Sequence, residues 1–98
     1  MKEVEFRAAI LLECLGEPIR FQILRHLETG PMTVSRLARL THRHVATVSH
    51  HLAVLRGMHI VRYRNRGHFA FYELKGRVAT DILTLAIRGA PKSSIPAA

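Results

Sequence analysis

The sequence predicts a mainly α-helical domain with a single small β-hairpin, in the order of four helices, two strands and one helix. Apolar residues recur at spacings of three and four over most of the chain, which is the period of a helix. Between residues 61 and 72 the period changes to two on both sides of a glycine, which is typical of a hairpin. A length of 98 residues with 48% hydrophobic residues suits one domain with its own core.

Two helices are expected before residue 30. The first spans Glu3–Leu15, and Gly16 ends it. The second begins at Glu17-Pro18, because proline is favoured in the first turn of a helix, and Gly30-Pro31 terminates it. The apolar stripes are Phe6, Ala9, Ile10, Leu12 and Leu15 in the first helix, and Ile19, Ile23, Leu24 and Leu27 in the second.

A pair of helices joined by a tight turn is expected next. Thr33 is suited to cap a short third helix, and residues 41–43 form the connection to a fourth helix, which Gly57 is expected to cap at its end. The residues expected to face inward are Val34, Leu37 and Leu40 in the third helix, and Val45, Val48, Leu52 and Leu55 in the fourth. Two helices joined in this way form a helix-turn-helix.

The hairpin is predicted from two alternating segments around a turn at residues 65–68. Val61 and Tyr63 alternate with arginines before the turn. Phe69 and Phe71 alternate with other residues after it, and the alternation favours these two rings as the inner face of the hairpin. A hairpin that follows a helix-turn-helix gives the winged-helix plan.

The last helix is expected over residues 77–88, with Val78, Ile82, Leu83, Leu85 and Ala86 on its apolar face. One winged-helix domain is therefore expected to span residues 1–89. Residues 90–98 contain two prolines and two serines, and we expect this tail to be disordered.

The placement of charge indicates a polyanionic partner. The formal net charge is +8 at pH 7, and residues 29–72 contain no Asp or Glu. The same span contains seven arginines and six of the seven histidines. Because release of counterions from a phosphate backbone favours a surface of one positive sign, double-stranded DNA is the expected partner.

The outer face of the fourth helix supplies the expected base contacts. Arg43, Thr47 and His50 lie near the start of this helix, where such helices meet base edges. Arginine can form a bidentate bond to guanine, and the threonine methyl group can pack on thymine. The cationic tip of the hairpin can lie against phosphates or enter the minor groove. The residues expected to contact DNA are Arg43, His44, Thr47, Ser49, His50 and His51 around the helix, and Arg64, Arg66 and His68 on the hairpin.

Three segments together resemble the ArsR/SmtB family of repressors. Residues 17–24, Glu-Pro-Ile-Arg-Phe-Gln-Ile-Leu, are similar to the family's D-P-T-R-x-x-I-L opening. Residues 47–56 resemble its T-V-S-x-H-L-x-x-L-R recognition helix, and residues 60–62 and 66–72 resemble its wing. The resemblance implies a homodimer that pairs through helices 3–15 and 77–88 and binds imperfect palindromes in promoters, from which an inducer releases it.

The sensing residues of the family are absent from this chain. Thr33 and Ser35 stand where the arsenic-type members have Cys-x-Cys. Of the zinc-type site, Asp81 is present, but Leu83 replaces the histidine and no second pair follows. We therefore expect no metal site and no cofactor. The operator cannot be carried over from relatives, because His42 occupies the turn and residues 44–46 differ from the family's Ser-x-Ser.

The seven histidines leave an alternative open, a metal-responsive or metal-buffering protein. Against it, His50 and His51 are adjacent and diverge by about 100° on a helix, and no carboxylate lies nearby in sequence. Zinc, nickel and copper calorimetry would distinguish the two functions.

Other classes of protein fit less well. Paired carboxylates, a nucleophile elbow and a phosphate-binding glycine loop are all missing from the sequence, so an enzyme is not expected. Neither a membrane span nor a secretory signal is evident, and the expected location is the cytoplasm.

Overall fold

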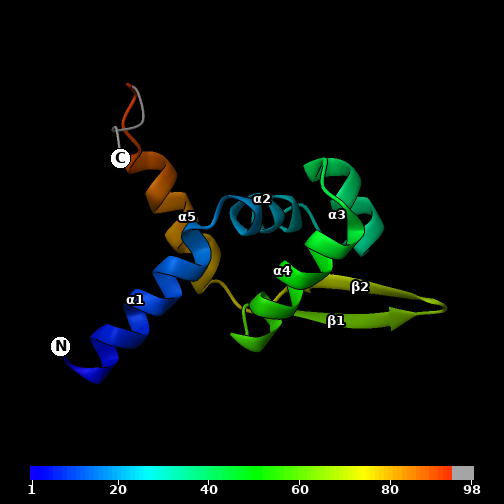
Figure 1. Cartoon of the computed structure of the whole chain (residues 1–98), viewed down its shortest axis with the longest axis horizontal. Helices are drawn as coiled ribbons and strands as arrows, with labels where there is room; N and C mark the ends of the chain where they lie inside the picture. The colour runs from blue at the N-terminus through cyan, green and yellow to red at the C-terminus, as the bar shows by residue number, and fades with distance from the viewer. Residues whose placement is uncertain (94–98) are drawn as a thin grey trace.

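The computed structural model describes residues 1–93, over which the chain forms five helices and one antiparallel hairpin (Figure 1). The predicted fold class and element order are confirmed. The elements are α1 (Glu3–Gly16), α2 (Pro18–Leu27), α3 (Val34–Thr41), α4 (Val45–Gly57), β1 (Val61–Arg66), β2 (Phe69–Leu74) and α5 (Val78–Gly89). Residues 94–98, most of the tail expected to be disordered, lie outside the described residues.

Side chains fix where α2 and α3 begin. The Glu17 carboxylate accepts a hydrogen bond from the Arg20 backbone N–H at 2.8 Å, and Pro18 fills the first position of α2. The Thr33 hydroxyl accepts from the Arg36 N–H at 3.2 Å and caps α3, as predicted. At the other end of α3, His42 adopts a left-handed conformation with φ 55°, which histidine tolerates better than most residues.

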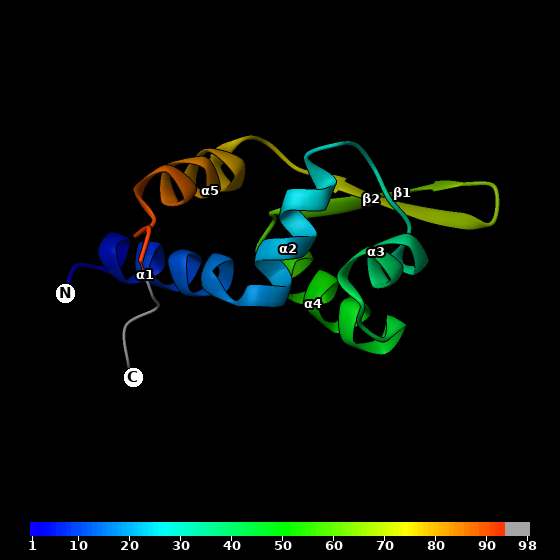
Figure 2. The same cartoon turned by 90° about the horizontal axis from the view of Figure 1, so that it is seen from above.

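Helix α2 is the centre of the domain and packs against α1, α3, α4, α5 and β2 (Figure 2). Its residues Ile23 and Leu24 are fully buried, as are Leu52 and Leu55 of α4. The hydrophobic core also includes Cys14, Leu15, Leu27, Met32, Leu37, Ala38, Val48, Ile60, Val61 and Leu83. The core therefore fixes α3 and α4 to α2, while α1 and α5 lie at the end of the molecule opposite the hairpin tip.

Two residues predicted to face inward are exposed. Leu40 and Val45 lie on either side of the turn and are 39% and 50% exposed. The buried face of α3 is instead formed by Leu37, Ala38 and Thr41, which places Leu40 on its flank. Val45 is the first residue of α4 and extends past the core.

The prediction that Gly57 caps α4 was also wrong. Gly57 is the last residue of the helix, and Met58 is its C-cap. The left-handed residue that turns the chain toward β1 is His59, with φ 60°.

The hairpin has a two-residue turn at Gly67-His68, and Gly67 has φ 59°. This geometry places a glycine at the first turn position, where a positive φ is needed. Tyr72 of β2 also forms two backbone hydrogen bonds with Met32, at 2.9 and 2.7 Å. These bonds fasten the hairpin to the segment between α2 and α3.

The prediction that Phe69 and Phe71 form the inner face of the hairpin was wrong. Val61 pairs with Leu74, and Arg66 pairs with Phe69. Because directly opposed residues share a face, both phenylalanines lie on the side of the hairpin that carries its arginines. Alternation within each strand did not reveal this, because the length of the turn sets which faces match across it.

The core analysis predicts the cost of truncating α4. Leu52→Ala removes a fully buried side chain and should lower the free energy of unfolding by about 2–5 kcal/mol, measured by urea denaturation. Val45→Ala on the same helix should change it by about 0.5 kcal/mol or less, because Val45 is half exposed. Equal losses in the two variants would contradict this description of the core.

Candidate nucleic-acid interface

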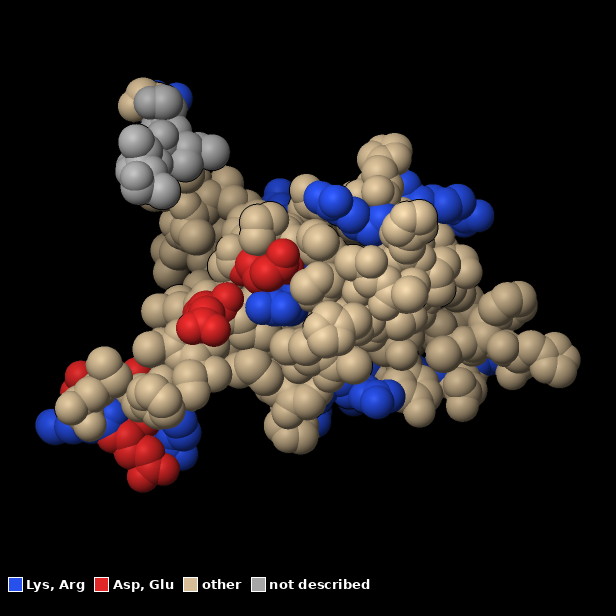
Figure 3. Space-filling model, viewed as in Figure 1, with Lys and Arg blue, Asp and Glu red and all other residues tan. Residues whose placement is uncertain are grey.

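The acid-free segment of the sequence folds into one half of the molecule. It runs from the end of α2 through α3 and α4 to β2. On the face of the molecule shown in Figure 3, acidic residues appear only over the left half, including the free end of α1. Over the right half, which contains α3, α4 and the hairpin, the only charged residues visible are basic. The surface suited to a polyanion is therefore formed by the helix-turn-helix and the hairpin together.

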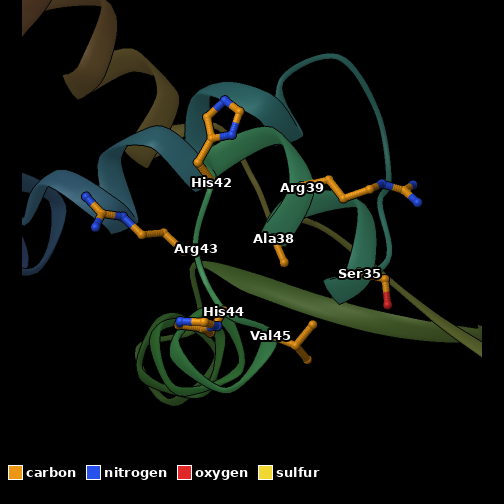
Figure 4. Close-up of a pocket in the computed structure, with 7 residues that line it drawn as sticks. All are labelled: Ser35, Ala38, Arg39, His42, Arg43, His44 and Val45. Atoms are coloured by element: carbon orange, nitrogen blue, oxygen red, sulfur yellow. The ribbon is translucent and has the colours of Figure 1, made fainter.

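A hollow of about 650 Å³ opens between α3 and the start of α4 (Figure 4). Ser35, Ala38 and Val45 face the space between the two helices, while Arg39 and Arg43 point to opposite sides of it. Its remaining lining residues are His42 and His44. The turn therefore combines a hollow with cationic side chains beside it. The cationic side chains are complementary to a phosphate group.

The outward face of α4 is centred on His50. The buried residues Val48, Leu52 and Leu55 define the opposite face, and His50 is exposed. Ser49 is exposed on one flank, and Thr47 is half-buried on the other. Sequence reasoning missed Ala53, which shares the outward face and whose small side chain lets the helix backbone approach a neighbouring surface closely.

The first and last of the residues around α4 that were predicted to contact DNA are placed differently from the others. Arg43 and His44 are exposed but precede the helix, and His44 is its N-cap without a side-chain hydrogen bond. His51 lies apart from the other predicted residues, because its ring is turned toward α2 and its side chain is only 12% exposed. Arg43, His44, Ser49 and His50 are thus each exposed at the start of α4 or along it, whereas His51 is turned toward α2.

The hairpin contains one acidic residue, which forms ion pairs with two of its arginines. Glu73 accepts from Arg62 at 3.1 and 3.2 Å and lies 3.4 Å from Arg64. The guanidinium of Arg66 instead lies over the Phe71 ring, 5.6 Å from its centroid. Among the predicted wing residues, Arg66 and the exposed His68 at the tip are therefore better placed than Arg64 to meet a phosphate.

The sequence matches a known family over the elements just described. A family model described as bacterial regulatory protein, arsR family, matches residues 17–63, from the cap of α2 into β1. An uncharacterised HTH-type transcriptional regulator of Methanocaldococcus jannaschii is 32% identical over 80 residues, which cover 81% of this chain and 90% of the relative. The chain belongs to the arsR family of bacterial regulatory proteins.

A second relative and a solved structure also match this arsR-family protein over most of its length. The transcriptional repressor SdpR of Bacillus subtilis is 28% identical over 71 residues, covering 72% of this chain and 79% of SdpR. The homodimeric winged helix-turn-helix DNA-binding domain Mb0332 of Mycobacterium bovis superposes with a TM-score of 0.79 at 25% identity, covering 89% of this chain and 81% of that one. The predicted family and the winged-helix fold are confirmed, and the chain is a DNA-binding transcriptional regulator.

The structure does not gather the histidines into a metal-binding group. Within residues 1–93, no three side chains of His, Cys, Asp or Glu lie close enough together to hold a metal ion. Asp81, the remaining member of the zinc-type pattern, is 4.0 Å from Arg77 on the surface of α5. Over the same described residues, no helix is long and apolar enough to cross a membrane.

The pairing of Glu73 with the wing arginines predicts that this acid weakens DNA binding. Glu73→Gln removes a negative charge and frees Arg62 and Arg64, so affinity for any duplex should rise about three- to tenfold. The slope of log Kd against log salt should steepen by about 1 in a titration followed by fluorescence anisotropy.

Asp81→Asn is the matched control, because it frees Arg77 at the N-terminal end of α5, which lies away from the tip of the hairpin (Figure 1). An equal effect of both substitutions would mean that net charge alone, and not the wing, is responsible.

Proposed function

We propose that this arsR-family protein is a homodimeric transcriptional repressor that binds a palindromic duplex in the cytoplasm and carries out no catalysis. The observation that carries the proposal is the exposed, acid-free strip of α4 beside a basic hairpin, at the opposite end of the molecule from two apolar helix faces. The first surface is suited to DNA, and the second to another copy of the chain.

Helix α4 is the proposed recognition helix in the major groove. His50 at the centre of its outward face can donate to an acceptor edge of a base, and Ser49 beside it can donate or accept. Arg43 and His44 approach from the turn, where arginine can bond to guanine. Thr47 contributes through the part of its side chain that remains exposed.

The hairpin is the proposed wing, which contacts the backbone or the adjacent minor groove. Arg66 and His68 lie at or next to its two-residue turn, at the tip of the hairpin. Arg64 takes part through the charge that Glu73 leaves unneutralised. Such contacts position the protein and follow groove width more than base sequence.

The proposed dimer interface is formed by α1 and α5. Phe6 is 56% exposed and Leu85 is 66% exposed, and neither belongs to the core of the chain. The other large apolar residues exposed on these helices are Val4, Ile10, Leu12, Val78 and Ile87. A second copy would cover these faces, and homodimeric Mb0332 supports that assembly. Two-fold symmetry would give two recognition helices and hence an inverted-repeat operator.

The signal that releases DNA is proposed to act without the family's familiar thiol or metal ligands. Thr33 caps α3 with its hydroxyl group and Ser35 lines the hollow beside the turn, so both positions serve other purposes here. Leu83 is buried in the core between α5 and the rest of the domain. None of these side chains offers a thiolate or imidazole ligand.

The dimer proposal predicts the effect of a charge on α1. Phe6→Glu would bury an unpaired carboxylate at the interface and should weaken self-association by about 100-fold or more, measured by sedimentation equilibrium. Phe69→Glu is the matched control, since this phenylalanine is equally exposed but lies on the wing. Dissociation of both variants, or of neither, would overturn the proposed interface.

The DNA proposal predicts a division of labour between wing and recognition helix. Selection of bound sequences from a random duplex pool should enrich an inverted repeat. Arg66→Ala should weaken binding to all duplexes alike, whereas Arg43→Ala and His50→Ala should cost about 1–3 kcal/mol on the selected site and change the bases enriched. A pool in which no sequence is enriched at moderate salt would sink the proposal.

A further inference from the structure

One guanidinium joins three helices behind the DNA-facing surface. Arg20 of α2 donates from Nε to the carbonyl oxygen of Cys14, in the last turn of α1, at 2.9 Å. Its Nη1 lies 3.0 Å from Nδ1 of His51, in the middle of α4. The Glu17 carboxylate, which caps α2 through the Arg20 N–H, lies 3.7 Å from the same Nδ1.

The contact between Arg20 and His51 defines the state of the imidazole ring. An arginine has only donors, so Nδ1 must accept the hydrogen bond. The ring is therefore neutral in this arrangement, and its proton resides on Nε2. A protonated ring would present a donor and a positive charge to the guanidinium and would break this bond.

We propose that Arg20 is a positioning residue for DNA recognition, which holds α4 in its reading orientation through neutral His51. This inference rests on the proposed function of α4 as the recognition helix. It gives His51 an indirect role in place of the direct DNA contact expected from the sequence. His50 is the next residue along the chain, so a shift of α4 at His51 moves the centre of its outward face.

Three groups surround the His51 ring from the elements packed against it. Arg20 and Glu17 face it from α2, and His50 lies edge-on at 5.4 Å on α4 itself. Burial lowers the pKa of His51, Glu17 opposes this change, and the charges of Arg20 and His50 reinforce it. The Glu17 carboxylate can accept a hydrogen bond from Nδ1–H of the ring once that nitrogen is protonated.

The network therefore makes recognition sensitive to acid. The stabilisation from neutral His51 is complete above the unfolded-state pKa of about 6.5 and is lost as pH falls through the lower pKa of the folded protein. Protonation would exchange the Arg20 contact for one with Glu17, the N-cap of the same helix, and would shift α4 relative to α2. Histidines 42, 44, 50 and 68 are also exposed on this half of the molecule, so the contribution of His51 is measured against a variant that keeps all four.

His51→Asn isolates the contribution of this ring. The amide oxygen of asparagine can occupy the place of Nδ1 and accept from Arg20, yet it does not titrate. The ratio of the wild-type Kd to the variant Kd, for the selected duplex in fluorescence anisotropy, should rise about fivefold between pH 7.5 and pH 5.5, the size expected for loss of one hydrogen bond. The matched control is His59→Asn, just beyond the C-terminal end of α4, where a positive φ also suits asparagine. A ratio for His51→Asn that is constant with pH would overturn the inference.

NMR titration of the free wild-type protein gives a second readout without DNA. The ring signals of His51 and the amides of His50 and Leu15 should share one midpoint below pH 6.5, because Arg20 connects the two helices. If they do so but no duplex is preferred, the positioning network stands and the proposed function fails. If the duplex is bound specifically while these amides do not respond to His51, the inference fails and the proposed function stands.

Discussion

The burial of α2 is the constraint on which the rest of the structure depends. Ile23 and Leu24 on this helix are completely enclosed, and every other helix and β2 pack around it. At about 25 cal/mol per Å² of apolar surface removed from water, two such side chains stabilise the fold by several kcal/mol. Because α3 and α4 contact α2 as well as each other, packing against α2 sets the orientation of α4, the proposed recognition helix. The polar groups of Glu17 and Arg20 add direction to this apolar contact.

The distribution of charge follows the same division. The half of the molecule proposed to face DNA contains no acid from residue 29 until Glu73, which lies at the base of the hairpin and neutralises part of the charge of Arg62 and Arg64. The positive field is therefore strongest at the turn before α4 and at the tip of the hairpin. Between these two points lies His50, where a base edge and not a phosphate is the expected neighbour.

The sequence predicted the elements and the family because both are recorded in local spacing. Period and capping residues located the helices to within a residue or two, and Thr33 and Pro18 stand where the structure uses them. The direction in which each side chain faces was harder to predict, since it depends on contacts between elements. Phe69 lies with the arginines because a two-residue turn sets the register of the hairpin. His51 faces α2 because Arg20, 31 residues earlier in the chain, meets it there. No periodicity within α4 contains that information.

The bridge between Met32 and Tyr72 has a consequence for how such a protein can diverge. The wing is joined to the helix-turn-helix by backbone hydrogen bonds, which do not depend on the side chains of either partner. Substitutions on the wing or on α4 can therefore alter which bases are favoured without altering the separation between the two contact points. In the proposed complex, the backbone would set the length of DNA that each subunit covers, while the side chains would set which bases are read within that length. New operators can arise at constant spacing.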